Sequence, residues 1–259
     1  MRIAVCAPQV PFARGGAEIF ADDLVVELRA RDHEVDLVTV PYKWYPGERV
    51  LSQAFLWRLL DLEEADGRPI QLVIATKFPS YVVRHQNKVV WLLHQFRQAY
   101  ELDRTELGQF GETAEERAAR RAVQRLDRIA LGEARKVFAT SRNVAERLER
   151  STGLRAELMP HPPQELPYRT DAYEDFGMVP YEAFLSEKPV VTTTDAGGPL
   201  EVVADRRTGL VCEPQPAALA QACSWLRDHL DEARAWGRAG KELARRVSWD
   251  DTIARLLQA

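Results

Sequence analysis

The segment 174-EDFGMVPYEAFLSEKPVVTTTDAGGPLEVV-203 carries the most specific pattern in this chain of 259 residues. Pro180 suits the first turn of a helix. Proline has no backbone N–H group, and an N–H group in the first turn would have no intrahelical partner. The β-branched run Val190–Thr194 is typical of a buried strand. Gly197 then opens a turn into a second helical pattern that reaches Asp205. The segment therefore predicts a loop, a helix, a strand, a Gly-rich turn and a further helix.

Two glutamates of this segment, Glu174 and Glu182, are separated by seven residues that include Gly177. A glycine lets the backbone come close to a ligand, because it has no Cβ. The free N–H groups of the first helical turn, with the positive end of the helix dipole, form a site for phosphate. Glu182 lies about one turn further in, where its carboxylate can accept hydrogen bonds from a ribose diol, and Glu174 can accept them from sugar hydroxyls. The alternative is that both glutamates are solvated or cap the helix, because the spacing alone is a weak signal.

The ten residues 174-EDFGMVPYEA-183 resemble the E-x7-E motif of the retaining GT-B glycosyltransferases of family 4. The strand VVTT and the following D-A-G-G-P-L-E-V-V also match the C-terminal domain of that family. The resemblance implies that Glu174 contacts the donor hexose in the catalytic centre and that Glu182 binds the donor ribose. It also implies that backbone groups hold the donor diphosphate along Phe176, Gly177, Met178 and Val179.

Composition and charge are those of an ordinary globular protein. The net charge of −4 gives no sign of a nucleic-acid partner. Three cysteines, Cys6, Cys212 and Cys223, form no C-x-x-C pair, which fits a reducing cytoplasm and predicts no metal site. The apolar run before Pro8 is too short for a signal peptide or a membrane span. We therefore expect a cytoplasmic protein that needs no cofactor besides its substrate.

The N-terminal pattern of strand, helix and strand predicts a doubly wound parallel sheet. The elements are expected at Arg2–Ala7, Ala17–Arg31 and Glu34–Val40. Gly15 and Gly16 would lie at the carboxyl end of the first strand, where such sheets bind ligands. The alternative is a plain tight turn. The sequence 14-RGGAE-18 resembles the N-terminal loop of the same family, which implies that both glycines approach the donor phosphates.

His94 directly follows another expected strand, Lys88–Leu93. A lone histidine in such a position is often structural. The stretch 90-VWLLHQFR-97 resembles the family segment in which a histidine approaches the donor sugar, which implies a catalytic role for His94. The remaining elements expected in this half are helices at Glu48–Leu62, Glu112–Lys136 and Asn143–Ser151, and strands at Gln71–Thr76, Val137–Thr140 and Ala156–Met159.

The run Pro160-His161-Pro162-Pro163 predicts a stiff linker between two domains. We expect an N-terminal Rossmann-like, acceptor-side domain at 1–160, a Pro-rich linker at 161–173 and a C-terminal nucleotide-sugar-binding domain with terminal helices at 174–259. In the resembling family about three βα units separate the linker from E-x7-E, so on the order of a hundred residues are absent here. The absent part would carry the basic pair, an Arg and a Lys, that neutralises the leaving diphosphate. The expected fold class is α/β, with two Rossmann-like parallel-sheet domains of GT-B type, the second truncated.

The sequence thus predicts a glycosyltransferase that moves a sugar from a nucleotide-sugar donor to a glycan or lipid acceptor with retention of configuration, impaired by the missing segment. One alternative is a non-catalytic nucleotide-sugar-binding or scaffold remnant of that fold. Another is a GT-B nucleotide-sugar epimerase, which would need further acid and base residues that the sequence does not identify. Alternating Arg and Glu along 112–136 indicate a solvated helix face. Peripheral association with the inner face of a membrane and homodimerisation both stay open.

Overall fold

The computed structural model of this chain describes residues 1–103, 105, 108–163 and 178–259. Contacts divide the chain into two compact units. The first contains Met1–Thr140, Val144–Met159 and Ile253–Ala259, and the second contains Ser141–Asn143 and Pro160–Thr252. The last seven residues therefore belong to the first unit, whereas the sequence pattern assigned them to the second. The linker expected at 161–173 lies outside the described residues from 164 onward.

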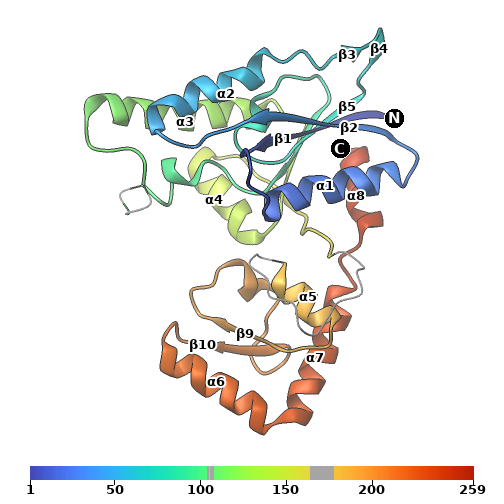
Figure 1. The fold of residues 1–259 in the computed structure, drawn as a ribbon, viewed down its shortest axis with the longest axis vertical. Helices are drawn as coiled ribbons and strands as arrows, with labels where there is room; N and C mark the ends of the chain where they lie inside the picture. Colours follow the sequence, from blue (N-terminus) through green and yellow to red (C-terminus); the bar gives the residue numbers. More distant parts are fainter. Residues whose placement is uncertain (104, 106–107, 164–177) are drawn as a thin grey trace. The chain divides into compact units, whose positions relative to one another are not determined.

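A six-stranded sheet forms the centre of the first unit (Figure 1). Its strand order is β2-β1-β5-β6-β7-β8. The strands are β1 (Arg2–Gln9), β2 (Glu34–Pro41), β5 (Leu72–Ala75), β6 (Lys88–Leu92), β7 (Lys136–Ala139) and β8 (Glu157–Leu158). Each neighbouring pair is parallel. The doubly wound parallel sheet predicted from the sequence is confirmed.

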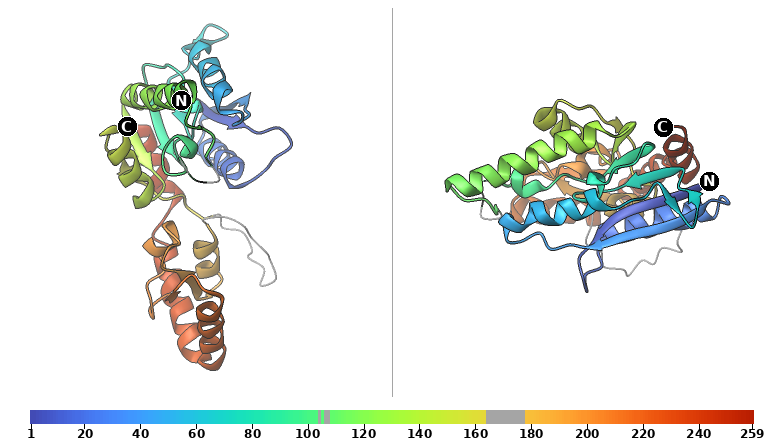
Figure 2. Two further views of the ribbon diagram at one scale, coloured as in Figure 1. Left: turned by 90° about the vertical axis from the view of Figure 1, so that its left-hand side faces the viewer. Right: turned by 90° about the horizontal axis from the view of Figure 1, so that it is seen from above.

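Helices cover both faces of this sheet (Figure 2). They are α1 (Gly16–Arg29), α2 (Val50–Leu59), α3 (Ala114–Gly132) and α4 (Arg142–Thr152). Successive strand residues point to opposite faces, and Ala4 and Cys6 of β1 join one core cluster with α2, α3 and α4. On the other face Phe20 of α1 packs against Trp91 of β6, with ring centroids 4.4 Å apart.

Local capping sets the helix bounds more narrowly than the sequence pattern did. The Thr113 hydroxyl accepts a hydrogen bond from the Glu116 N–H, and the Glu116 carboxylate accepts one from the Thr113 N–H. This capping box starts α3 at Ala114. The helix ends at Gly132. Lys136, which the sequence pattern assigned to this helix, is instead the first residue of β7.

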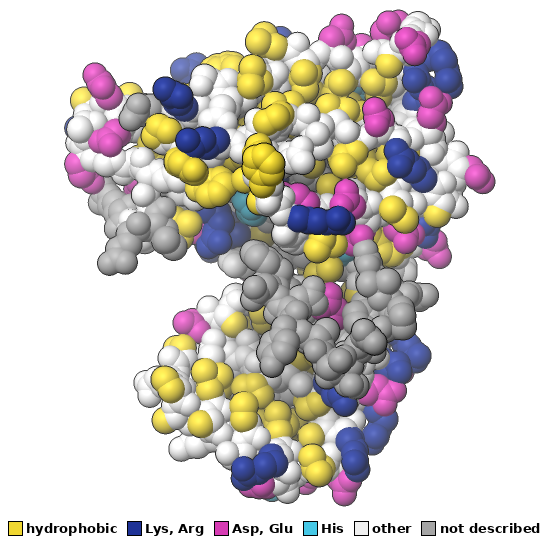
Figure 3. Space-filling view, viewed as in Figure 1, with side chains coloured by type: hydrophobic (Ala, Val, Ile, Leu, Met, Phe, Trp, Pro, Cys, Tyr) yellow, Lys and Arg dark blue, Asp and Glu magenta, His cyan; other side chains and the backbone are white. Residues whose placement is uncertain are grey.

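Helix α2 leaves part of its apolar surface in solvent. A 3₁₀ turn, η1 (Gly47–Arg49), precedes it, so the α-helix is shorter than the expected span 48–62. Trp57 is fully buried, whereas Phe55, Leu56 and Leu59 are exposed. Figure 3 shows hydrophobic side chains at the surface of the first unit in the region of α2.

A short hairpin between α2 and β5 was not predicted. It pairs β3 (Glu64–Ala65) with β4 (Arg68–Pro69) in antiparallel register. Asp66 and Gly67 form its turn, and both have positive φ, at 53° and 67°. Asp-Gly is the preferred dipeptide for such a turn, so the signal was present in the sequence.

The second unit is built around two parallel strands, β9 (Val190–Thr193) and β10 (Gly209–Cys212). Its helices are α5 (Val179–Leu185), α6 (Pro216–Asp228), α7 (Leu230–Ala244) and the start of α8 (Trp249–Gln258). Gly209 must be a glycine, because a Cβ there would lie 1.9 Å from the Val190 carbonyl oxygen. The helix expected from Gly197 to Asp205 is wrong in extent, since only the 3₁₀ turn η4 (Gly198–Glu201) forms.

Helix α7 holds α5 in place through two glycines. A Cβ on Gly237 would lie 2.0 Å from the Glu187 carbonyl oxygen, and a Cβ on Gly240 would lie 2.2 Å from the Phe184 ring. Phe184 is fully buried with Ala244 beside it. Because Gly237 and Gly240 have no side chains, the two helices approach closely enough to bury Phe184.

Candidate functional site

Two of the candidate segments lie at one edge of the first unit's sheet. Gly15 and Gly16 follow β1, and His94 follows β6. All six strands are parallel, so their carboxyl ends meet at the same edge, where open α/β sheets bind ligands. This edge brings together residues that are far apart in the sequence.

The Gly15–Gly16 turn is tied to the start of α1 by Glu18. Gly15 caps the helix with an extended backbone, at φ −143°, and its N–H donates to Glu18 Oε2 at 2.9 Å. The other carboxylate oxygen, Oε1, lies 3.3 Å from Nζ of Lys77, and both side chains are largely buried. The carboxylate thus links the glycine turn to a cation from another loop.

Lys77 is a further candidate at the same end of the sheet, and the sequence analysis did not single it out. It lies two residues beyond β5, which sits between β1 and β6 in the sheet. A basic side chain just beyond the end of a predicted parallel strand, in the run Thr76-Lys77-Phe78-Pro79, was the available signal.

His94 is oriented as a neutral hydrogen-bond acceptor. Its Nδ1 lies 2.8 Å from the Gln95 carbonyl oxygen, so Nδ1–H donates and Nε2 keeps a lone pair. Burial lowers the pKa of His94; the hydrogen bond to Gln95 opposes this shift, and the charges of Lys77, Arg97 and Arg147 add to it. The ring can therefore accept a hydrogen bond from a hydroxyl group at neutral pH.

A buried carboxylate supports the loop that carries His94. Asp127 of α3 is fully buried and accepts hydrogen bonds from the hydroxyls of Tyr81 and Tyr100, both at 2.8 Å, and from the Gln95 amide at 3.3 Å. Burial raises the pKa of Asp127 to about 7, although these three donors oppose the shift. The side-chain amide of Gln95 is thus bound to Asp127, while its backbone carbonyl accepts from His94. These two hydrogen bonds hold the His94 ring in place.

The second unit contains the described part of the E-x7-E segment. Met178 is the N-cap of α5, and Pro180 lies in its first turn. Glu182 is in the same turn, and its N–H donates to the Met178 carbonyl at 3.1 Å. Val179 is the first helical residue, so the predicted helix start is confirmed. Glu174, Phe176 and Gly177 lie outside the described residues, as does the junction between Tyr173 and Glu174.

Within the described ranges, no group of three or more His, Cys, Asp or Glu side chains could hold a metal ion. No helix in the described part of the chain is long and apolar enough to cross a membrane.

These features define an α/β protein of GT-B type, with its candidate site at the carboxyl ends of the parallel strands. Residues 14–161, more than half of the chain, match the family model described as Glycosyltransferase Family 4, and the chain belongs to that family. Residues 154–243 match a second model, described as Glycosyl transferases group 1.

Curated relatives align over parts of the chain. The alpha-1,3/1,6-mannosyltransferase ALG2 of Mus musculus is 34% identical over 90 residues, which are 34% of this chain and 21% of the mouse protein. The D-inositol 3-phosphate glycosyltransferase of Corynebacterium urealyticum is 34% identical over 125 residues, 44% of this chain and 29% of that protein. The alignments thus span less than a third of the length of either relative.

Solved structures support the same fold. A sucrose-phosphate synthase from Thermosynechococcus elongatus superposes with a TM-score of 0.72 and 17% identity, over 99% of this chain and 97% of the other. Anabaena HepE in complex with UDP-glucose superposes with a TM-score of 0.50 and 14% identity, over 100% of this chain and 98% of the other. At such identities the likeness concerns the fold.

Proposed function

We propose that this protein is a glycosyltransferase that uses a nucleotide-sugar donor and retains the anomeric configuration. The observation that carries the proposal is family membership across the first unit, combined with a second glycosyltransferase match across the E-x7-E segment. HepE, which shares the fold, is described as a complex with UDP-glucose, and ALG2 as a mannosyltransferase. Both descriptions favour a hexose donor. We take the acceptor to be a glycan or a lipid, as the family resemblance implies.

The proposed roles follow from the chemistry of each residue. The N–H groups around Met178 and Val179 would receive the diphosphate, and Glu182 would accept hydrogen bonds from the ribose. Nε2 of His94 would accept a hydrogen bond from a donor-sugar hydroxyl, with Glu174 contacting the same hexose. The bond from the anomeric carbon to phosphate oxygen breaks, and the acceptor oxygen bonds to that carbon from the same face. The acceptor proton passes to the leaving phosphate, so the protein contributes positioning and charge stabilisation.

We further propose that this chain lacks an internal segment of the family's second domain and that transfer is slow for that reason. In the described part of the second unit only β9 and β10 form a sheet. The basic pair expected in the absent segment has no counterpart among the residues that we assign. Losing one donor that stabilises a developing oxyanion costs about 100- to 1000-fold in rate.

The three free cysteines agree with a cytoplasmic location for this reaction.

Isothermal titration with a panel of UDP- and GDP-sugars, with product analysis on the same samples, tests this function. Saturable binding of one donor together with slow release of a glycosylated product is the expected result. Binding without any product would favour the non-catalytic nucleotide-sugar-binding protein. A new sugar nucleotide with no acceptor glycosylated would favour the epimerase. Failure of every donor to bind would refute the proposal.

A further inference from the structure

Helix α2 carries an apolar stripe on the face that points to solvent. Phe55, Leu56 and Leu59 are 52%, 47% and 80% exposed, and Ser52 is exposed beside them. These four residues follow the i, i+3, i+4, i+7 spacing, which places them on one side of the helix. We call this set the α2 stripe. An exposed stripe of adjoining apolar side chains indicates a binding surface, because a partner that covers it removes it from water.

The opposite face and the flanks of α2 are already occupied. Three residues of the inward face are fully buried, namely Val50, Ala54 and Trp57. The Gln53 amide accepts a hydrogen bond from the Lys43 N–H at 2.7 Å and donates one to the Lys43 carbonyl at 2.6 Å. Arg58 donates to both oxygens of the Glu133 carboxylate. The helix therefore cannot turn the α2 stripe inward, and the stripe is a fixed outward surface.

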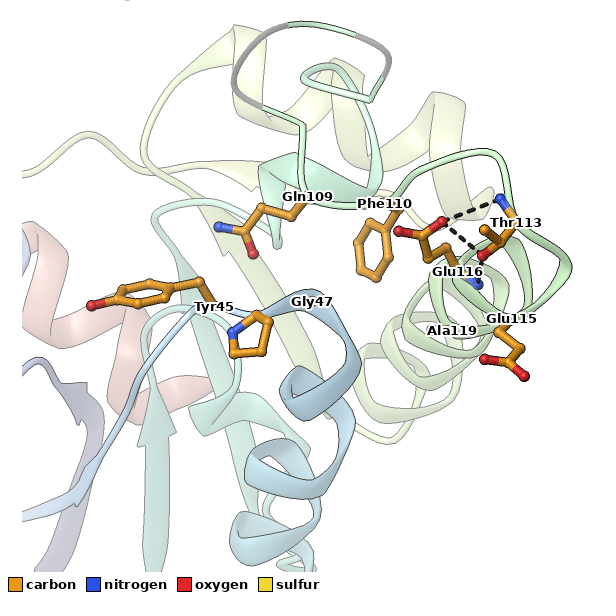
Figure 4. Close-up of a pocket in the computed structure, with 9 residues that line it drawn as sticks. Tyr45, Gly47, Gln109, Phe110, Thr113, Glu115, Glu116 and Ala119 are labelled. Atoms are coloured by element: carbon orange, nitrogen blue, oxygen red, sulfur yellow. Dashed lines mark hydrogen bonds between the residues drawn. The ribbon is translucent and has the colours of Figure 1, made fainter.

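The loop before α2 is anchored as well. Figure 4 shows Tyr45, Gly47 and Gln109 in the lining of a cavity of about 630 Å³. A Cβ on Gly47 would lie 2.8 Å from the Gln109 carbonyl oxygen, so the loop touches the stretch that precedes α3. The Trp44 and Tyr45 rings pack edge-on with centroids 5.3 Å apart, and both are partly exposed. This aromatic pair is thus held at the N-terminal end of α2.

The charges around the α2 stripe disfavour a membrane as its partner. Asp61, Glu63 and Glu64 are exposed just beyond the C-terminal end of α2, whereas Lys43 and Arg49 are exposed before its start. An anionic membrane attracts clusters of Lys and Arg and would repel three carboxylates in one short stretch. A surface that is acidic at one end and basic at the other suits a partner that presents the same surface in the opposite direction.

We propose that the α2 stripe is the interface of a homodimer, in which α2 packs antiparallel against α2 of a second copy. The two-fold axis of such a dimer would pass between Phe55 and Leu56, so that each Phe55 meets the partner's Leu56. Ser52 would then meet the partner's Leu59, and the small serine side chain leaves room for the larger leucine. The α2 stripe is therefore complementary to itself in shape.

The same pairing places opposite charges at the two ends of the interface. Arg49 would lie opposite the partner's stretch 61–63, in which two of the three residues are acidic. The hairpin of β3 and β4 follows α2, so the hairpin of each copy would lie beside Trp44 and Tyr45 of the other. Three large apolar side chains per copy, with this rim, place the contact at the small end of specific interfaces. We therefore expect a reversible dimer whose population rises with protein concentration.

Sedimentation velocity of the full chain over a range of concentrations tests the dimer. The native chain should associate reversibly. Leu59→Glu should weaken this association about 10-fold or more, because a two-fold interface receives the buried carboxylate twice. Val26→Glu is the matched control, since Val26 is a 61% exposed apolar residue on α1, and it should associate like the native chain. Arg49→Glu should also weaken the dimer, and Glu63→Arg in the same chain should restore it.

The possible outcomes decide between a second copy and a lipid surface. A native chain that is monomeric at every concentration, or equal association by the native chain and Leu59→Glu, would overturn the proposal. Vesicles of phosphatidylcholine with phosphatidylserine are the comparison. A monomeric chain that binds these vesicles and loses binding in Leu59→Glu would assign the α2 stripe to a membrane and overturn the dimer. Donor titrations do not bear on this result, because none of the residues to which we assign donor binding lies on α2.

Discussion

Replacing Gly237 by alanine tests how α7 positions the helix that carries Glu182. The added Cβ would lie 2.0 Å from the oxygen and 2.4 Å from the carbon of the Glu187 carbonyl. These are backbone atoms at the end of α5, so no side-chain rotation can relieve the contact. Helix α7 and the α5–β9 turn must therefore move apart in the variant.

The expected magnitude comes from two opposing effects. Alanine is favoured over glycine inside a helix by about 0.8–1.0 kcal/mol. Overpacking a close contact costs about 1–3 kcal/mol, and backbone atoms at 2.0 Å favour the upper part of that range. We expect Gly237→Ala to lower the free energy of unfolding of the second unit by about 1–2 kcal/mol, the difference between these terms.

The matched control is Gly132→Ala in α3, where an added Cβ meets nothing within 4 Å. This variant keeps the helix-propensity gain without the steric cost, so it should be neutral or slightly stabilising. Urea unfolding gives the overall stability, and hydrogen exchange measured by mass spectrometry on peptides from α5 and α7 locates the change. Nucleotide-sugar affinity should also fall, because Glu182 lies on α5. A Gly237→Ala protein with native protection in α5 would refute this account of the packing.

Glu182→Gln should weaken nucleotide-sugar binding by about 1–3 kcal/mol, the range for a charge-assisted hydrogen bond, and an unchanged titration with intact circular dichroism would contradict the ribose role. The pKa of Asp127 rises on folding from 3.8 to about 7, so the stability that this carboxyl contributes is lost as pH rises through that window. Urea midpoints of the native chain should therefore fall between about pH 4 and pH 7 relative to Asp127→Asn, and parallel profiles would exclude the effect. The ring protons of His94, assigned by comparison with His94→Gln, should titrate in NMR below the usual pKa of 6.5, and a higher midpoint would show that the ring is not neutral.

Local patterns were sufficient to predict most elements of the fold. Apolar and β-branched runs such as Val190–Thr194 predicted buried strands, and the observed β9 begins at the same residue. Turn chemistry placed Gly15 and Gly16 after β1, and strand length placed His94 after β6. A parallel topology then brings these ends together, because every strand of such a sheet points the same way. The signal for the hairpin at Asp66-Gly67 is equally local, since this dipeptide favours a two-residue turn.

Contacts between distant segments could not be predicted in this way. No short-range pattern connects the segments that meet in these contacts. Examples are the Glu18–Lys77 pair, the approach of Gly237 to Glu187, and the cavity lined by Tyr45 and Gln109. Helical periodicity identifies which residues of α7 face inward but not which helix they meet. Those partners are selected when the apolar faces pack together, since burial of apolar surface is non-directional and close packing fixes the pairs of atoms that touch.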